Sequence, residues 1–140
     1  MKQIGVIGTG TMGTGIIQLL ALNDYEVVMT ARRQTSIDNG IAYVEKSMTK
    51  MVEKGKLSEL EKNTAMSHKG STDINIVKDA GLIIEATTED MAAKKTLFAQ
   101  LDKICKPEAI FATNTSALSI TEIAEATTRP DKVIGMHFFN

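Results

Sequence analysis

One stretch near the start of the chain constrains the fold more than any other. The segment "GVIGTGTMGTG", residues 5–15, ends an aliphatic run at 3–8 and opens a helical pattern at 11–23. Gly8, Gly10 and Gly13 have the spacing that allows a tight turn, an approach of the backbone to a diphosphate, and close packing of the helix. The first amides of such a helix favour an anion. We expect a dinucleotide to bind the loop residues Gly8, Thr9, Gly10, Thr11, Met12 and Gly13; a merely glycine-rich turn is the alternative.

The rest of the chain alternates short apolar runs with longer helical patterns, which is typical of a parallel sheet covered by helices. Strands are predicted at 3–8, 26–30, 66–71, 81–86, 109–113 and 132–138, with 66–71 the weakest pattern. Helices are predicted at 11–23, 36–54, 58–65, 74–79, 91–104 and 119–126. We therefore predict an α/β fold with a doubly wound (Rossmann), mostly parallel sheet, as one domain over residues 1–140.

A helical hairpin is expected between the second and third strands. Ile37, Ile41, Val44, Met48 and Met51 alternate spacings of four and three, which places them in one apolar stripe. The pattern continues through "EKGKLSE" into a second short helix. A mononucleotide-binding half does not need this insertion, so we expect it to serve a substrate.

Composition excludes several partners. Lys+Arg number 16 and Asp+Glu 17, so nothing indicates a nucleic-acid-binding or membrane-binding surface, and we expect neither partner. The single Cys105 forms no internal disulfide, and no run reaches the roughly 18 apolar residues of a membrane span. A first strand at about residue 3 leaves no room before it for a signal peptide. We expect a cytoplasmic protein without a metal site.

The end of the second strand bears on cofactor choice. An NAD-binding unit normally has an acidic residue there for the ribose hydroxyls, but this chain has Ala31, Arg32 and Arg33. No carboxylate at this position repels a 2'-phosphate, and two guanidiniums can pair with one. We predict a preference for NADP(H), with NAD(H) also used; the alternative is that both arginines are solvated surface charges.

Three later stretches, "IIEATTEDMAAKKTLFAQLD", "IFATNTSALSITEIA" and "RPDKVIGMHFFN", carry a family resemblance. In this order after the glycine loop, they resemble the N-terminal domain of 3-hydroxyacyl-CoA dehydrogenases, in particular the bacterial 3-hydroxybutyryl-CoA dehydrogenases. The resemblance implies an NAD(P)-dependent oxidoreductase of fatty acid and butyrate metabolism. Its reaction interconverts acetoacetyl-CoA and 3-hydroxybutyryl-CoA.

The resemblance also implies roles for individual residues. His137 matches the catalytic acid/base, Ser116 matches a serine that contacts the substrate oxygen, and Asn114 matches an amide of the catalytic and nicotinamide pocket. Histidine suits this role because its ordinary pKa lies near working pH. Ala117 stands where the family usually has a second serine. Without the resemblance, His137 reads as a packed strand-end residue and Asn114 to Ser116 as a helix-capping cluster.

Charged residues complete the expected site. Glu89 and Lys94 match family positions that contact the cofactor, and Glu85 is a weaker candidate. Ser47 and Lys54, on one face of the hairpin, match positions that touch CoA, with further lysines nearby. For these charges the alternative is an ordinary solvated surface.

The resemblance implies that two parts of the family lie beyond residue 140. One is a glutamate that orients the histidine, and the other is the helical domain that follows it and forms a homo-oligomer. We therefore expect this chain to bind cofactor and to turn over little substrate alone. Two other functions stay open. One is a dehydrogenase of a non-CoA hydroxy acid, and the other is a non-catalytic NADP-binding module or fragment.

Overall fold

The computed structural model of the chain describes residues 3–138, and residues 1–2 and 139–140 lie outside that range. Six strands form one sheet, in the order β3-β2-β1-β4-β5-β6, and every neighbouring pair is parallel. The strands are β1 (Gln3–Ile7), β2 (Glu26–Thr30), β3 (Lys69–Ser71), β4 (Leu82–Glu85), β5 (Ile110–Thr113) and β6 (Val133–Gly135). All six predicted strands are confirmed, including the weak third one, and the doubly wound order is the one predicted.

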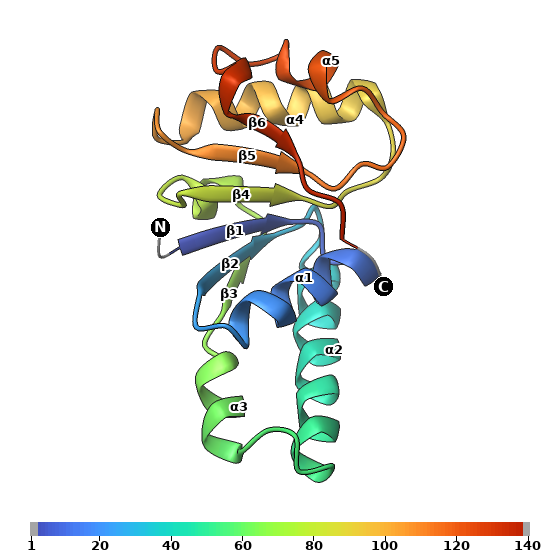
Figure 1. Cartoon of the computed structure of the whole chain (residues 1–140), viewed down its shortest axis with the longest axis vertical. Helices are drawn as coiled ribbons and strands as arrows, with labels where there is room; N and C mark the ends of the chain where they lie inside the picture. Colours follow the sequence, from blue (N-terminus) through green and yellow to red (C-terminus); the bar gives the residue numbers. More distant parts are fainter. Residues whose placement is uncertain (1–2, 139–140) are drawn as a thin grey trace.

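The helices also follow the prediction closely (Figure 1). They are α1 (Thr11–Ala21), α2 (Gln34–Glu53), α3 (Glu59–Ala65), α4 (Met91–Ile104) and α5 (Ile120–Ala124). The helix predicted at 74–79 is instead a 3-10 turn, η1 (Ile74–Val77), and a second one is η2 (Pro130–Lys132). The Asp73 carboxylate accepts the Asn75 amide at 2.9 Å and begins η1 as a tight turn.

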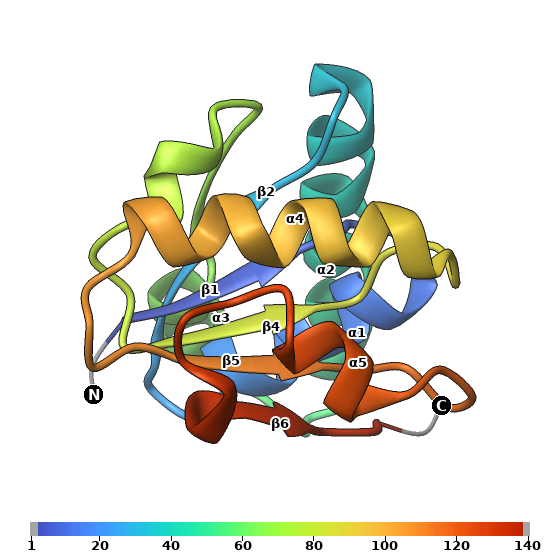
Figure 2. The ribbon, with the colours of Figure 1, turned by 90° about the horizontal axis from the view of Figure 1, so that it is seen from above.

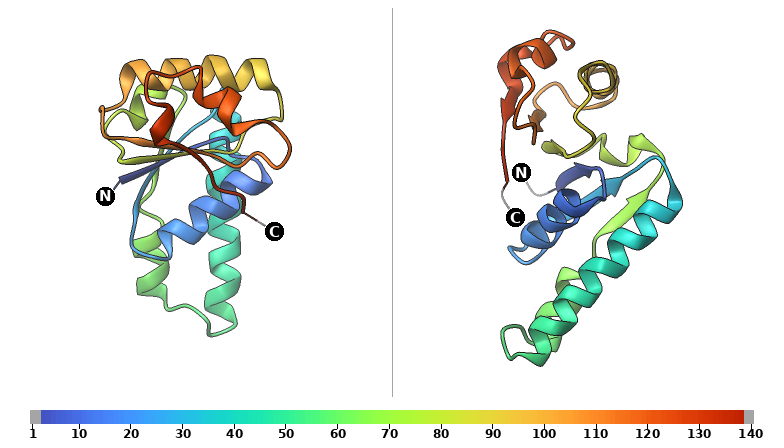
Figure 3. Two further views of the ribbon diagram at one scale, coloured as in Figure 1. Left: turned by 45° about the horizontal axis from the view of Figure 1, so that its top comes forward. Right: turned by 90° about the vertical axis from the view of Figure 1, so that its right-hand side faces the viewer.

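Helices cover both faces of the sheet. One core packs α1, α2 and α3 against it, through residues such as Ile17, Met29 and Met48. The other core packs η1, α4 and α5 against the opposite face, around Phe98 and Phe111. The views from above and from the side show α4 and α5 on one side of the sheet and α1 and α2 on the other (Figures 2 and 3). This two-sided covering explains why the central strands are apolar throughout.

The predicted hairpin is α2 and α3, which project away from the sheet (Figure 1). Its stripe is confirmed, because Ile37, Val44 and Met48 are buried while Ile41 and Met51 pack against the same core. A full capping box starts α3, since Ser58 and Glu61 each bond the backbone amide of the other.

The α5 start at Ser119 shows only part of the expected cap. The Ser119 hydroxyl accepts the Glu122 amide at 3.2 Å, as predicted. The Glu122 carboxylate, however, lies 3.5 Å from the Lys95 ammonium.

Strand β6 is shorter than the predicted 132–138. Its neighbour β5 ends at Thr113, whose carbonyl accepts the Met136 amide at 2.9 Å. Two residues later the Phe138 amide donates to the Asn114 side-chain oxygen at 2.8 Å. A side chain therefore replaces the backbone ladder, and His137 lies in an irregular segment after the strand.

Arg129 joins the last part of the chain to α4 and β5. Its Nε lies 2.7 Å from the Asp102 carboxylate, and one terminal nitrogen donates to the Lys106 carbonyl at 2.5 Å. The guanidinium carbon also lies 4.8 Å from the centre of the Phe111 ring. Burying an arginine is tolerated here because its donors meet several acceptors and an aromatic face.

Candidate functional site

The glycine loop follows β1 at the point where the sheet reverses its winding direction, between β1 and β4. Ile7 at the end of β1 lies in register with Thr30 of β2 and Glu85 of β4. Connections from β1 and β4 leave in opposite directions and open a crevice at the carboxyl ends of the strands, where such sheets bind ligands.

Each glycine of the loop has the geometry expected from its spacing. Gly8 has a φ of 100°, and a Cβ there would lie 2.5 Å from the Ala86 carbonyl oxygen. A Cβ on Gly13 would collide with the Gly8 carbonyl, so this glycine allows the close packing of α1. A Cβ on Gly10 would meet nothing within 4 Å. The space beside Gly10 is therefore open to a ligand.

The start of α1 is prepared for an anion. Gly10 is its N-cap, and among the described residues no side chain caps the helix and no acidic residue lies in its first turn. Thr11 is exposed and Met12 half-buried. The Thr9 hydroxyl points elsewhere, donating to the Ser36 carbonyl at 2.8 Å, which ties the loop to α2. The residues present fit a diphosphate at this helix terminus.

A pocket of about 1070 Å³ extends from the glycine loop along the carboxyl ends of β1 to β4, and Asn114, Ser116 and His137 are not among its lining residues. It is lined by the loop and strand ends, by the start of the turn after β3 and by one face of α4. Gly8, Gly10, Ala31 and Arg32 are lining residues that the sequence predicted, whereas Arg33 is the exposed N-cap of α2. A dinucleotide needs an elongated site of this kind.

Two acidic residues that the sequence analysis did not predict, Asp73 and Asp90, also line the pocket. Thr72, Asp73, Ile74 and Asn75 line it together with Arg32. Backbone and side-chain hydrogen bonds from Asn75 hold the pKa of Asp73 below its ordinary value, so the carboxylate is charged. As predicted, position 31 has no carboxylate to repel a 2'-phosphate. The Asp73 carboxylate, however, lines the same pocket. The position of Asp73 just after the strand predicted at 66–71 was the feature of the sequence that could have indicated it as a pocket residue.

The three residues expected to do chemistry meet at the same edge of the sheet. Asn114 and Ser116 follow β5, and His137 follows the neighbouring β6. Ser116 and His137 are exposed, and Asn114 is half-buried, with its side chain bonded to the Phe138 amide at 2.8 Å. The fold thus brings these residues together, while their catalytic roles stay predictions.

The charged candidates form a cluster beside them. The Lys94 ammonium, only 1% exposed, lies 2.5 Å from a carboxylate oxygen of the fully buried Glu85 and 3.5 Å from Glu89. Glu85 also accepts bonds from the hydroxyls of Thr87 and Thr113. From the sequence, Glu85 was a weaker candidate than Glu89 and Lys94. In the structure Glu85 lies at the centre of the cluster, because it bonds Lys94, Thr87 and Thr113. Direct contact of Lys94 with a cofactor stays a prediction.

The buried carboxylate of Glu85 is ionised. Burial by itself raises its pKa, but hydrogen bonds from Lys94, Thr87 and Thr113 outweigh this effect and leave the pKa below its ordinary value. A buried charge of this kind is tolerated because both of its oxygens have donors.

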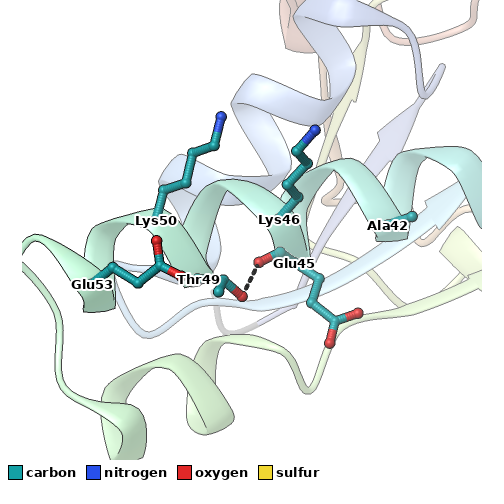
Figure 4. A pocket seen from close by; sticks show the side chains of 6 residues that line it. All are labelled: Ala42, Glu45, Lys46, Thr49, Lys50 and Glu53. Atoms are coloured by element: carbon teal, nitrogen blue, oxygen red, sulfur yellow. Dashed lines mark hydrogen bonds between the residues drawn. The ribbon is translucent and has the colours of Figure 1, made fainter.

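The hairpin residues expected to touch CoA lie apart from this pocket. Ser47 is half-buried within α2, and Lys54 is its exposed C-cap. A shallow hollow on the same helix is lined by Ala42, Glu45, Lys46, Thr49, Lys50 and Glu53. The ammonium groups of Lys46 and Lys50 point the same way in it (Figure 4). The two lysines and two glutamates of the hollow balance in charge, and neither Ser47 nor Lys54 lines it. The CoA contact of Ser47 and Lys54 therefore stays a prediction.

Residues 3–138 contain neither a membrane-spanning helix nor a cluster of metal ligands. Within this range, no helix combines the length and the apolar character needed to cross a lipid bilayer. The same residues contain no group of three or more His, Cys, Asp or Glu side chains that could hold a metal ion.

Comparison with known proteins agrees with this geometry. A family model described as "3-hydroxyacyl-CoA dehydrogenase, NAD binding domain" matches residues 3–140. A 3-hydroxybutyryl-CoA dehydrogenase of Clostridioides difficile is 52% identical over 139 residues, covering 99% of this chain and 50% of the relative. The crystal structure of (S)-3-hydroxybutyryl-CoA dehydrogenase from Ralstonia eutropha matches with a TM-score of 0.96 and 40% identity, over 100% of this chain and 50% of that one. The chain thus spans about half the length of these relatives.

Proposed function

Because the chain belongs to the 3-hydroxyacyl-CoA dehydrogenase family, we propose that it is the cofactor-binding domain of a 3-hydroxybutyryl-CoA dehydrogenase. The observation that carries this proposal is the glycine loop at the point where the sheet reverses its winding, with open space beside Gly10. Since the chain spans about half the length of these relatives, we propose the dehydrogenase activity for a protein of the relatives' full length that includes this domain.

The cofactor is a nicotinamide dinucleotide, held at Gly8 to Gly13 by the amides that begin α1. Its adenosine end lies near Ala31 and Arg32, and Arg32 and Arg33 favour NADP(H) over NAD(H) through a 2'-phosphate. Asp73 opposes this preference from the same pocket. We place Glu89, Asn114 and Ser116 at the nicotinamide end, because they lie along the same carboxyl edge of the sheet.

The bound nicotinamide supplies hydride transfer to and from carbon 3 of the acyl-CoA. His137 accepts the proton of the substrate hydroxyl during oxidation and donates it during reduction, which suits an exposed imidazole. The Ser116 hydroxyl donates to the substrate oxygen, and Asn114 holds the segment that carries His137. Ser47 and Lys54 of the hairpin contact the CoA moiety.

The remaining parts of this proposal concern the protein in the cell. Its pathway is fatty acid and butyrate metabolism, its location is the cytoplasm, and the full-length protein is a homo-oligomer. The pathway and the oligomer rest on the family membership of the chain. The location rests on the composition, which has one cysteine and no long apolar run.

Two measurements test the function. Titration of the chain with NADPH and NADH, followed by nicotinamide fluorescence, is expected to show saturable binding. In the full-length protein, acetoacetyl-CoA is expected to be reduced and free 3-oxo acids are not.

A variant tests the role of the histidine. His137→Gln should lower kcat by about 10²- to 10⁴-fold and leave cofactor affinity within about twofold.

The outcomes separate the alternatives. Reduction of free acids in preference to CoA esters supports a dehydrogenase of another substrate class. Cofactor binding without any turnover in the full-length protein supports a non-catalytic module. No nucleotide binding at all contradicts the proposal.

A further inference from the structure

Two hydrogen bonds join the glycine loop to the segment between β2 and α2. The Gly8 amide donates to the Thr30 carbonyl at 3.0 Å, at the end of β2. The Thr9 hydroxyl donates to the Ser36 carbonyl at 2.8 Å, in the first turn of α2. The two bonds enclose residues 31–35, so the loop holds this short connection at both of its ends.

The enclosed connection carries the two arginines of the proposed 2'-phosphate site. Arg32 lines the pocket that begins at the glycine loop, and Arg33 is the N-cap of α2. Both side chains are exposed, and within residues 3–138 neither forms a salt bridge. Their position relative to the loop therefore depends on the backbone of the connection rather than on partners of the guanidinium groups.

The two bonds differ in what they require of the sequence. The bond from Gly8 is a backbone bond, which any residue except proline can donate. The bond from Thr9 needs a hydroxyl at the position between Gly8 and Gly10. Only this second contact depends on a side chain, so a substitution at Thr9 can remove it and leave the backbone bond in place.

Helix α2 lies unusually close to the glycine loop at Gly40. This residue is buried one turn after Ser36, and a Cβ there would lie 3.0 Å from the Thr9 Cβ and 3.4 Å from the Thr14 Cγ2. A glycine inside a helix costs about 1 kcal/mol relative to alanine. The missing side chain allows Thr9 to lie against α2, within hydrogen-bond distance of the Ser36 carbonyl.

We propose that Thr9 is a positioning residue for cofactor specificity, because its hydroxyl fixes Arg32 and Arg33 at the distance from the diphosphate site that NADP(H) requires. This inference rests on the proposed function. In NADP(H) the adenosine ribose carries both the diphosphate and the 2'-phosphate. A fixed distance between the two sites lowers the cost of binding both groups at once. NAD(H) lacks the second phosphate, so its binding does not depend on this distance.

The first experiment compares the dissociation constants of NADPH and NADH in a full-length protein that includes this domain. Thr9→Val keeps the side-chain shape and removes the donor, whereas Thr9→Ser keeps the donor. Thr9→Val is expected to weaken NADPH about fivefold and NADH by less than about twofold. Thr9→Ser should stay within about twofold of wild type for both nucleotides, since it keeps the bond.

A matched control is Thr64→Val, which removes a hydroxyl that donates to a backbone carbonyl on α3 and should change neither constant. An equal loss for both nucleotides in Thr9→Val means that the hydroxyl serves the diphosphate loop alone, and overturns the inference. Unchanged constants for both nucleotides in Thr9→Val overturn it as well.

A double-mutant cycle tests whether Thr9 acts through the arginines. In a background of Arg32→Ala with Arg33→Ala, Thr9→Val should change NADPH affinity by less than about twofold, because no guanidinium is left to position. A loss that stays at about fivefold in this background shows that the hydroxyl acts independently of the arginines, and contradicts the positioning role.

Amide hydrogen exchange in the ligand-free protein separates this inference from the proposed function. The Ser36 and Ile37 amides donate to the Arg33 carbonyl at the start of α2, at 3.1 and 3.3 Å. Thr9→Val should speed their exchange by about threefold or more, whereas Thr9→Ser and Thr64→Val should not. Unchanged exchange in Thr9→Val rules out the positioning role whether or not a cofactor binds. If exchange responds as expected but wild type binds no nicotinamide nucleotide, the proposed function fails and the specificity role fails with it.

Discussion

The Asn114 side-chain oxygen accepts the backbone amide of Phe138 at 2.8 Å, so a residue after β5 holds the segment after β6 that carries His137. Two neighbouring strands end here, and within residues 3–138 no ladder bond between them follows the one from the Met136 amide to the Thr113 carbonyl. The placement of His137 therefore depends on a side chain rather than on the sheet.

Replacing Asn114 tests this dependence. Asn114→Ala removes the acceptor and is expected to lower kcat of the full-length protein by about 10- to 100-fold, because a small misplacement of an acid/base is costly. Steady-state kinetics with acetoacetyl-CoA measure it. Asn63→Ala, at an exposed position of α3, is the control. Wild-type kcat in Asn114→Ala contradicts the role.

Gly10 and Gly15 form a matched pair for the diphosphate site. Both have open space where a Cβ would lie, so alanine at either position leaves the fold intact. Gly10→Ala is expected to weaken NAD(P)H binding by about tenfold or more, since the methyl group occupies the approach to the backbone. Gly15→Ala should keep the affinity and raise stability by about 0.5–1 kcal/mol. Fluorescence titration and thermal unfolding measure both effects; equal affinity in the two variants argues against a diphosphate at this loop.

Arg32 and Asp73 should pull cofactor choice in opposite directions. Arg32→Ala is expected to weaken NADPH by about tenfold or more and NADH by less than about twofold, because it removes a charge-assisted bond to a 2'-phosphate. Asp73→Asn keeps the acceptor for the Asn75 amide, removes the charge and should strengthen NADPH relative to NADH. Dissociation constants for both nucleotides measure the ratio, with Lys103→Ala as the control. A parallel change for both nucleotides in Arg32→Ala contradicts the NADP(H) preference.

Arg129 should matter for stability rather than for cofactor affinity. Arg129→Met removes the counterion and one of the donors of Asp102 and the guanidinium donor to the Lys106 carbonyl, and is expected to cost about 3 kcal/mol of the free energy of unfolding. Lys95→Met, which breaks the exposed pair with Glu122, should cost less than about 1 kcal/mol. Urea unfolding compares them. Similar losses in the two variants contradict the distinction between buried and exposed pairs.

Stability should fall in acid through Glu85 and Asp102. For Asp102, burial raises the pKa, but bonds from Thr128 and Arg129 outweigh it, so both carboxyls have a pKa below the ordinary value. A lowered folded-state pKa means that the stabilisation is complete above the ordinary values near 4.5 and 3.8 and is lost as pH falls through the folded values. Urea unfolding from about pH 6 to about pH 3 should show this loss, and Asp102→Asn should flatten it. An unchanged slope in Asp102→Asn excludes its contribution.

Local patterns in the sequence determined most of the fold. Apolar runs located five of the six strands, and the glycine spacing located the turn that begins α1, because both depend on residues close together in the chain. Capping at Ser58 was equally local and is confirmed. The predicted last strand was too long, because local sequence does not show where β6 ends. That end depends on where its neighbour β5 stops.

The tertiary structure alone decided which side chains meet at the carboxyl edge of the sheet. Asp73 lines the same pocket as Arg32, and the buried Lys94 ammonium pairs with Glu85. No spacing in the sequence indicates these contacts, because they depend on strand order and on which helix face turns inward. The sequence by itself located the strands and most of the helices to within a few residues, and it predicts a dinucleotide at the glycine loop. Packing decided the partners of each charge, because a charged group keeps its ionisation in the core only where the folded chain brings donors or a counterion to it.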